Sequence, residues 1–172
     1  TAIFVTSCGK APQNGKDGEE QVTINVFNWG DYIGESTIAD FEKAYPGIKV
    51  NYEDFSTNED MYVKIKTGAS DYDVAIPSDY MIKRMIDEDL LCKIDMENIP
   101  NYKYIDDRFK ALSYDPDNEY SVPYMWGTVG ILYNKTMVSE PVDSWKILWD
   151  EKYSKEILMQ DSERDSIGVT LK

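Results

Sequence analysis

Between residues 22 and 86, three segments with strand patterns alternate with three segments with helix patterns, and this order constrains the fold most. Residues 22–27 are rich in β-branched and aromatic side chains, residues 48–53 alternate apolar with polar, and residues 73–76 form a short apolar run. Strands joined through helices pair in parallel, because each helix returns the chain to the end of the sheet at which the preceding strand began. The sequence therefore predicts a right-handed, largely parallel α/β sheet.

The three helical segments carry their own start and stop residues. The first begins at Ser36–Thr37, has apolar residues at positions 38, 41 and 45, and is stopped by Pro46–Gly47. The second is predicted to begin with a capping box from Ser56 to Glu59, and Gly68 ends it. The third follows Pro77–Ser78, and its apolar stripe is expected to pack into the core: Met81, Ile82, Met85 and Ile86.

Charge and composition exclude several classes of function. The chain has 172 residues, with 18 Lys and Arg against 32 Asp and Glu, a formal charge of −14 and no histidine. Nucleic acid is excluded as the main partner, because phosphate binding requires clustered basic residues. Without histidine, Ser-His-Asp and Cys-His catalysis are absent, as is the commonest ligand of zinc and copper. A cationic partner fits this charge, although solubility alone also accounts for it.

The beginning of the chain resembles the end of a secretory signal followed by a tether. Residues 1–7 are a short apolar stretch, predicted to be a signal-peptide remnant. Val5–Cys8 resembles a bacterial lipoprotein box, which predicts that Cys8 is acylated; the alternative is an ordinary thiol in a disordered leader. Residues 8–21 are polar and contain glycine, as in a flexible tether.

The second cysteine, Cys92, is expected to be a small buried apolar side chain in Leu90–Ile94. Two cysteines provide no metal framework, and we expect neither a metal nor a cofactor. No run approaches the roughly 18 apolar residues that a spanning helix requires, so any membrane link is expected to be by an anchor.

Two lobes are predicted, and the second is incomplete. Residues 101–118 are polar and loop-like, whereas residues 121–134 form a long aromatic and β-branched run, predicted to be a strand that bends at its glycines. We place a crossing between lobes near Gly130, which gives a first α/β lobe over 22–130 and the beginning of a second over 131–172. The second segment is too short for a core of its own, so we expect the chain to be truncated.

Candidate binding residues follow two of the predicted strands. In open α/β sheets, ligands bind outside the carboxyl ends of the strands. Trp29, Asp31 and Tyr32 follow the first strand, and Ser78 and Tyr80 follow the third. Aromatic faces attract alkylammonium groups and a carboxylate completes the charge match, so an elongated amine fits this set, and a sugar could also stack there. The alternative is that the rings cap the core and the carboxylate is a solvated turn residue.

The same residues carry a resemblance to the spermidine/putrescine-binding proteins of bacterial polyamine ABC importers. The matching stretches cover essentially everything after the tether: residues 27–32, 56–62, 72–80, 121–127, 144–149 and 161–165. The resemblance implies a two-lobed, periplasmic-binding-protein-like fold that closes on a polyamine and delivers it to a membrane permease. It also implies an extracytoplasmic location, in the periplasm or on the outer face of the cell membrane.

The resemblance also implies roles for individual residues. Trp29, Asp31 and Tyr32 would contact the polyamine from the first lobe, with Ser78 and Tyr80 beside them. In the second lobe the family uses two acidic residues three positions apart. The later one matches Asp165, but the earlier one falls on Ser162, with Asp161 beside it. This departure leaves open how many charges the site supplies, and so which polyamine it prefers.

Other functions remain as alternatives at this point. A related solute-binding protein for a different small solute would share most of these features. A hydrolase would depend on a carboxylate pair, the only abundant acid and base groups here, yet nothing in the sequence fixes two carboxylates at a suitable spacing. A surface adhesion module fits the anchor, but no motif supports it. We expect a binding protein and not an enzyme.

Overall fold

The computed structural model describes residues 3–4 and 21–172 and divides the chain into two compact units, Thr1–Trp126 (unit 1) and Gly127–Lys172 (unit 2). Unit 1 contains a four-stranded sheet in the order β1-β4-β2-β3. β2 pairs in parallel with β3 and with β4, and β1 pairs antiparallel with β4. The predicted, largely parallel α/β sheet is therefore confirmed. Its strands are Ile3–Phe4, Val22–Trp29, Ile48–Phe55 and Val74–Ala75.

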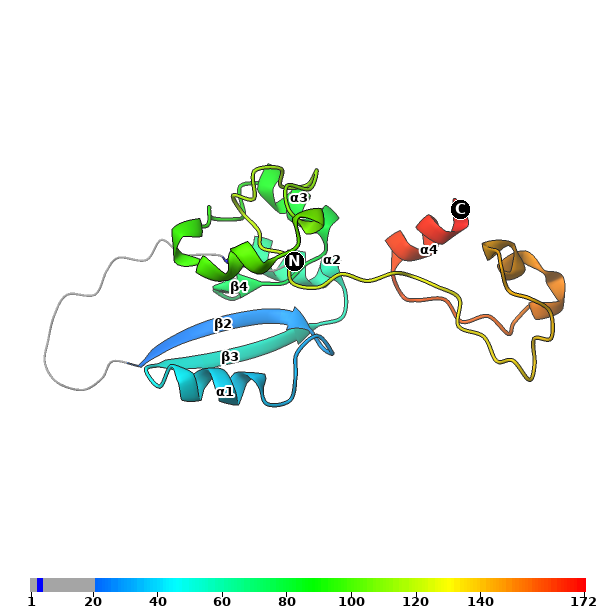
Figure 1. Cartoon of the computed structure of the whole chain (residues 1–172), viewed down its shortest axis with the longest axis horizontal. Coiled ribbons are helices and arrows are strands. Elements are labelled where there is room, and N and C mark those ends of the chain that lie inside the picture. The colour runs from blue at the N-terminus through cyan, green and yellow to red at the C-terminus, as the bar shows by residue number, and fades with distance from the viewer. Residues whose placement is uncertain (1–2, 5–20) are drawn as a thin grey trace, which may run out of the picture. The chain divides into compact units, whose positions relative to one another are not determined.

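Each parallel strand is followed by a helix, as predicted. The helices are α1 (Thr37–Ala44), α2 (Asn58–Thr67) and α3 (Asp79–Asp87). Gly68 ends α2 with a φ of 63°, a left-handed conformation that glycine adopts without steric cost. In Figure 1, α1 lies along β3 and β2 runs beside β3.

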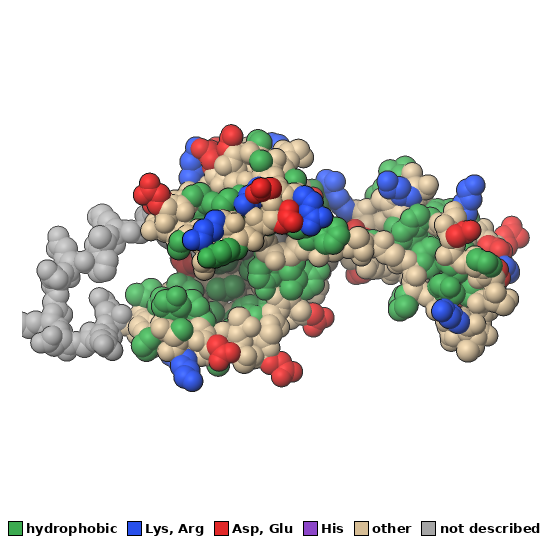
Figure 2. Space-filling view, viewed as in Figure 1, with side chains coloured by type: hydrophobic (Ala, Val, Ile, Leu, Met, Phe, Trp, Pro, Cys, Tyr) green, Lys and Arg blue, Asp and Glu red, His purple; other side chains and the backbone are tan. Residues whose placement is uncertain are grey.

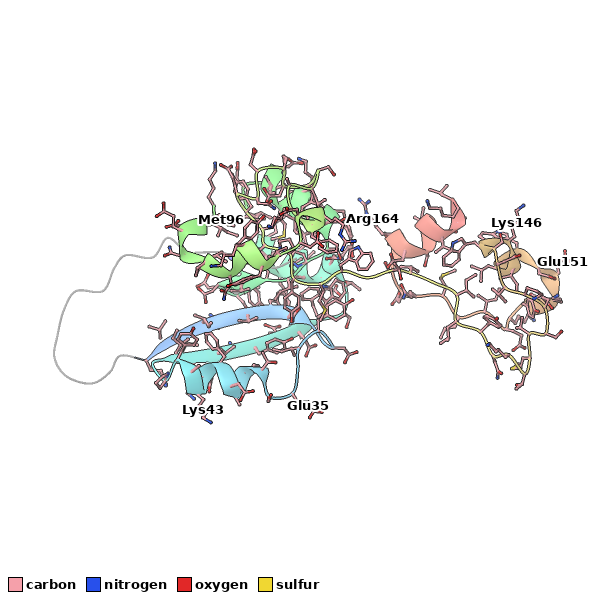
Figure 3. The ribbon with its side chains drawn as sticks, in the orientation of Figure 1. Glu35, Lys43, Met96, Lys146, Glu151 and Arg164 are labelled. Atoms are coloured by element: carbon pink, nitrogen blue, oxygen red, sulfur yellow. The ribbon has the colours of Figure 1, made fainter. Side chains whose placement is uncertain are left out.

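Helix α1 also protects the edge of the sheet. The Glu42 carboxylate accepts a hydrogen bond from the backbone N–H of Val50 at 3.0 Å and from the Lys49 ammonium at 2.8 Å. A side chain of α1 thus pairs a backbone group of the outermost strand β3, which would otherwise be available to another chain. Figure 3 shows Lys43 of α1, and Glu35 just before it, pointing away from the body of unit 1.

The core of unit 1 is built around Phe27 of β2. Its ring is stacked on Tyr72 with centroids 4.3 Å apart, and meets Phe55 edge-on at 4.9 Å. The predicted stripe of α3 packs into this core: Met81, Ile82 and Met85 are fully buried, and Ile86 packs against them half-buried. Close packing of these apolar side chains fixes α2 and α3 on one face of the sheet.

Several local predictions differ from the structure. The N-cap of α2 is Thr57, whose hydroxyl accepts from the Asp60 N–H at 3.1 Å; the predicted capping box from Ser56 to Glu59 is therefore wrong by one residue. The shift arises because β3 continues through Phe55 and delays the start of the helix. Cys92 is half-buried and not fully buried as predicted, because it lies in an irregular segment after α3.

The predicted strand over residues 121–134 does not form. A strand requires a neighbouring strand to pair its N–H and C=O groups; over residues 121–134 Val122 alone makes an isolated bridge, and no strand is present. The structure divides the chain after Trp126, whereas the boundary at residue 130 stays a prediction. The signal remnant over 1–7 and the tether over 8–21 also stay predictions. Except for residues 3, 4 and 21, they lie outside the described residues.

Unit 2 consists of short helical turns and one α-helix. Two 3₁₀ turns, Trp145–Trp149 and Glu151–Tyr153, precede helix α4 (Glu163–Thr170). The Tyr153 hydroxyl donates to Glu140 at 2.5 Å, and Lys152 pairs with the same carboxylate. Leu132 and Leu158 are almost completely exposed, in keeping with the small core expected of so short a segment.

A polar network joins the ends of α2 and α3. The Glu88 carboxylate accepts from the Lys66 ammonium at 2.7 Å, from the Tyr62 hydroxyl at 2.6 Å and from the Arg84 guanidinium at 3.0 Å. These donors lower the pKa of Glu88 to about 2, from an ordinary value of 4.5. Figure 2 shows basic and acidic side chains interspersed on the visible face of unit 1.

We predict that unit 1 loses stability at acid pH because Glu88 becomes protonated. Because its pKa is depressed in the folded state, its contribution is present above about pH 4.5 and is lost as the pH falls towards 2. Denaturant unfolding should show that Glu88→Gln lowers the free energy of unfolding at pH 7, by an amount that shrinks below pH 4. Asp87→Asn, which removes the exposed ion pair to Lys83, is the control and should cost little at any pH. A Glu88→Gln effect independent of pH would contradict this account.

Candidate functional site

Three parallel strands of unit 1 end at the same edge of the sheet, and a loop follows each of them. Strand β2 ends at Trp29 directly opposite Phe55, the last residue of β3. On its other side β2 pairs with β4, through Phe27 and Ala75, and β4 runs into Pro77–Ser78. Since all three strands are parallel, their carboxyl ends share this edge, where ligands of open α/β sheets bind.

Two aromatic rings of the first loop contact each other. The Trp29 ring lies 4.6 Å from the Phe55 ring and 5.9 Å from the Tyr32 ring, tilted against both. Trp29 is half-buried and packs against the core, whereas Tyr32 is 43% exposed. One ring is therefore fixed by the core and the other is open to solvent. The candidate residues Trp29 and Tyr32 are brought together as the sequence predicts.

The backbone of this turn is held by a buried asparagine. Asn28 is only 2% exposed, and its Oδ1 accepts from the Trp29 N–H at 2.8 Å, while its Nδ2 donates to the Tyr32 carbonyl at 3.4 Å. The Tyr32 N–H closes the turn by donating to the Trp29 carbonyl at 3.3 Å. Asp31 lies inside the turn with an exposed side chain. The same short turn thus carries an exposed carboxylate and the ring of Tyr32.

A second buried asparagine holds the loop after β4. Asn58, 5% exposed at the start of α2, accepts from the Ser78 N–H at 2.9 Å and donates to the Ser78 hydroxyl at 3.0 Å. This two-point contact fixes the N-cap residue of α3 across 20 positions of sequence. In this contact the half-buried Ser78 hydroxyl is the acceptor, so Asn58 does not use its hydrogen.

Tyr80 repeats the pairing of an aromatic ring with a carboxylate. Its hydroxyl donates to Glu59 at 3.0 Å, and its half-buried ring packs against the core. Glu59 lies in the first turn of α2, one residue after Asn58. The first turns of α2 and α3 are therefore joined at two points, and both points involve a candidate residue, Ser78 or Tyr80.

The remaining candidate residues lie in unit 2, at the start of α4. Ser162 is the N-cap, and its hydroxyl accepts from the Asp165 N–H at 3.3 Å. Asp161 is exposed, whereas Ser162 and Asp165 are half-buried. A serine at this position thus stabilises the helix, because its hydroxyl accepts a hydrogen bond from a first-turn N–H group that has no partner within the helix.

Sequence reasoning missed several residues that shape this edge. Asn58 and Glu59 belong to a stretch that the resemblance includes, yet nothing in the sequence shows that they face Ser78 and Tyr80. Tyr52 and Tyr124 also reach the first turn, through their hydroxyls. Alternation within β3 favours a half-buried Tyr52, but no sequence signal links Tyr124 to Tyr32. Within the described part of the chain, no group of three or more Cys, Asp and Glu is arranged to hold a metal ion.

The fold and this edge define the class of protein. An α/β unit with rings, hydroxyls and carboxylates at the carboxyl ends of parallel strands is suited to binding a small solute. A family model described as bacterial extracellular solute-binding protein matches residues 36–171, and the chain belongs to this family.

Particular relatives narrow the likeness to polyamine-binding proteins. The chain is 38% identical over 137 residues to the putrescine-binding periplasmic protein PotF of Escherichia coli, covering 75% of this chain and 37% of that protein. It is 34% identical over 154 residues to the spermidine/putrescine-binding periplasmic protein of Salmonella typhimurium, covering 87% and 43%. The chain thus spans about two fifths of the length of these relatives.

Solved structures agree with the fold prediction. A putative spermidine/putrescine ABC transporter protein from Listeria monocytogenes matches with a TM-score of 0.82 and 47% identity, over 87% of this chain and 46% of that one. The Tp0655 (TpPotD) lipoprotein of Treponema pallidum matches with a TM-score of 0.81 and 37% identity, over 87% and 47%. These neighbours are two-lobed periplasmic binding proteins, so the predicted fold class is confirmed.

We predict that Asn58 is required for the loop that carries Ser78. Asn58→Ala leaves the Ser78 N–H without its acceptor and should lower the free energy of unfolding by about 1–3 kcal/mol. Asn58→Asp keeps an acceptor for that N–H and should cost less. Thermal denaturation gives the stabilities, and hydrogen exchange of the Ser78 amide should accelerate in Asn58→Ala. Equal stability of Asn58→Ala and the wild type would contradict the contact.

Proposed function

We propose that this chain is the first lobe and the start of the second lobe of a solute-binding component of an ABC importer, and that the solute is spermidine or putrescine. The observation that carries the proposal is the turn after β2, where the exposed Asp31 lies in sequence between Trp29 and Tyr32, whose ring centroids are 5.9 Å apart. Alkylammonium groups are attracted by aromatic faces and form charge-assisted hydrogen bonds to carboxylates. Relatives whose names include putrescine or spermidine support the same class of ligand.

Other candidate residues would extend this contact along an elongated amine. Ser78 and Tyr80 would add hydroxyl groups from the neighbouring loop, both held in place through α2. Asp161, Ser162 and Asp165 of unit 2 would contact the polyamine from the other side of an interlobe cleft. Because Ser162 stands where the family has a carboxylate, Asp165 and Asp161 would make the contacts to ammonium groups in that unit.

The proposal includes delivery of the polyamine to permease subunits in the membrane, without catalysis. Membrane attachment would be through acylation of Cys8, a residue outside those described by the structure. Among the described residues, no helix is long and apolar enough to cross a membrane. An extracytoplasmic location, with the protein held at the membrane by a lipid and a tether over 8–21, follows from this reading.

Calorimetry on the full-length protein tests the proposal, with spermidine, putrescine and glucose as ligands. We predict binding of at least one polyamine at micromolar concentration or below, and no heat of binding with glucose. Asp31→Asn and Trp29→Ala should each weaken polyamine binding roughly tenfold to a hundredfold, because a contact to a charged group is lost.

Asp40→Asn is the matched control, since Asp40 is an exposed carboxylate in the first turn of α1. It should bind polyamines as the wild type does. Failure of both polyamines to bind would refute the proposed function, whereas equal losses in Asp31→Asn and Asp40→Asn would point to a general effect of net charge.

A further inference from the structure

Two tyrosine hydroxyls from distant parts of unit 1 converge on the turn after β2. The Tyr52 hydroxyl donates to the carbonyl of Trp29 at 3.2 Å, and the Tyr124 hydroxyl donates to the carbonyl of Tyr32. These carbonyls are the first and last of the turn that carries Asp31. The turn is therefore held at both ends by side chains that lie outside it.

Strand pairing and burial fix the position of Tyr52. It lies in β3 opposite Val26 of β2, three residues before the turn, and its side chain is half-buried. Burial raises the pKa of the Tyr52 hydroxyl, which lies near Asn28 and Tyr124. A protonated hydroxyl can act as a donor, as the contact to the Trp29 carbonyl requires.

Tyr124 reaches the turn from 92 positions further along the chain. The segment that leads to Tyr124 begins at the fully buried Ser121, whose hydroxyl donates a hydrogen bond to the buried Asp115 at 2.7 Å. Asp115 also accepts from the backbone N–H groups of Glu119 and Tyr120, so hydrogen bonds fix the start of this segment. Tyr124 itself is 42% exposed and is not among the buried core residues. Its position is therefore explained better by its hydroxyl contact than by packing.

We infer that Tyr124, together with Tyr52, is a positioning residue for the polyamine site. By fixing the Tyr32 carbonyl, Tyr124 sets the direction in which the Tyr32 ring and the Asp31 carboxylate leave the turn. A turn held in its binding geometry before the ligand arrives loses less conformational freedom on binding. This inference rests on the proposed function, because the turn must be the place where the polyamine binds.

Conservative variants of the full-length protein test this role by calorimetry with putrescine and spermidine. Tyr124→Phe and Tyr52→Phe keep the ring and remove only the hydroxyl. Each should weaken binding of the preferred polyamine roughly threefold to tenfold, as expected for the loss of one hydrogen bond. For the exposed Tyr124, the melting temperature should stay at the wild-type value. Tyr45→Phe is the matched control, a half-exposed tyrosine that packs against Phe41, and it should bind as the wild type does.

Two further readouts separate positioning from direct contact with the ligand. In the protein without ligand, Tyr124→Phe should shift the NMR amide signals of Asp31, Tyr32 and Ile33, because the turn is released. In a Tyr32→Ala background, the loss caused by Tyr124→Phe should shrink, since the ring to be positioned is gone. Fully additive losses with unchanged amide signals would show that Tyr124 touches the polyamine itself, and would overturn the inference.

The inference and the proposed function fail in different ways. If wild-type protein binds a polyamine and Tyr124→Phe binds it equally well, the positioning role is wrong and the function stands. If the wild type binds no polyamine, the proposed function is wrong, and the role at a polyamine site falls with it. The amide signals of the turn would then still decide whether Tyr124 holds the turn.

Discussion

The parallel pairing of β2 with β3 and β4 is the constraint on which the rest of unit 1 depends. It places the carboxyl ends of three strands at one edge, so that Trp29, Phe55 and the Pro77–Ser78 loop after β4 share this edge although they are far apart in sequence. The register is specified by Phe27, which must face Phe55 and Tyr72 in the core. A slip by one residue would turn Phe27 to the opposite face and move Trp29 with it.

At this edge, buried polar side chains hold the backbone and leave other side chains open to solvent. Asn28 and Asn58 are both almost fully buried; Asn28 makes two hydrogen bonds to the turn that follows it, and Asn58 makes two to Ser78 in the loop after β4. Burying an amide is costly unless it is fully paired, so these contacts favour one conformation of each loop. Asp31 and Tyr32 remain exposed on a turn whose backbone is already fixed. Such a division suits a site that binds a small solute without rearranging the core beneath it.

The pattern of the sequence was sufficient for the three parallel strands and the helices that follow them, because β-branched runs and apolar stripes record burial directly; it did not predict β1. Trp29 and Tyr32 could be placed together because both lie at the carboxyl end of one strand. The cap of α2 was predicted one residue early, because the sequence does not show that β3 extends to Phe55. The run over 121–134 has strand composition, but a strand also depends on a partner, which composition does not provide.

Long-range side-chain contacts could not be predicted from the sequence. The hydrogen bond from Tyr124 to Tyr32 joins residues 92 positions apart, and that from Asn58 to Ser78 joins residues 20 apart. Neither follows from local spacing, because each depends on how helices and loops pack against the sheet. These contacts nevertheless decide which way the candidate residues face. In this chain the sequence indicates the chemistry of the edge, and tertiary packing sets its geometry.

The most direct test of the account is a crystal structure of the full-length protein bound to putrescine or spermidine. The account predicts one ammonium group within hydrogen-bond distance of the Asp31 carboxylate, with the amine chain against the rings of Trp29 and Tyr32. It also predicts that the carbonyls of Trp29 and Tyr32 remain bonded to the hydroxyls of Tyr52 and Tyr124. A polyamine bound away from the carboxyl edge of β2 would contradict the central claim.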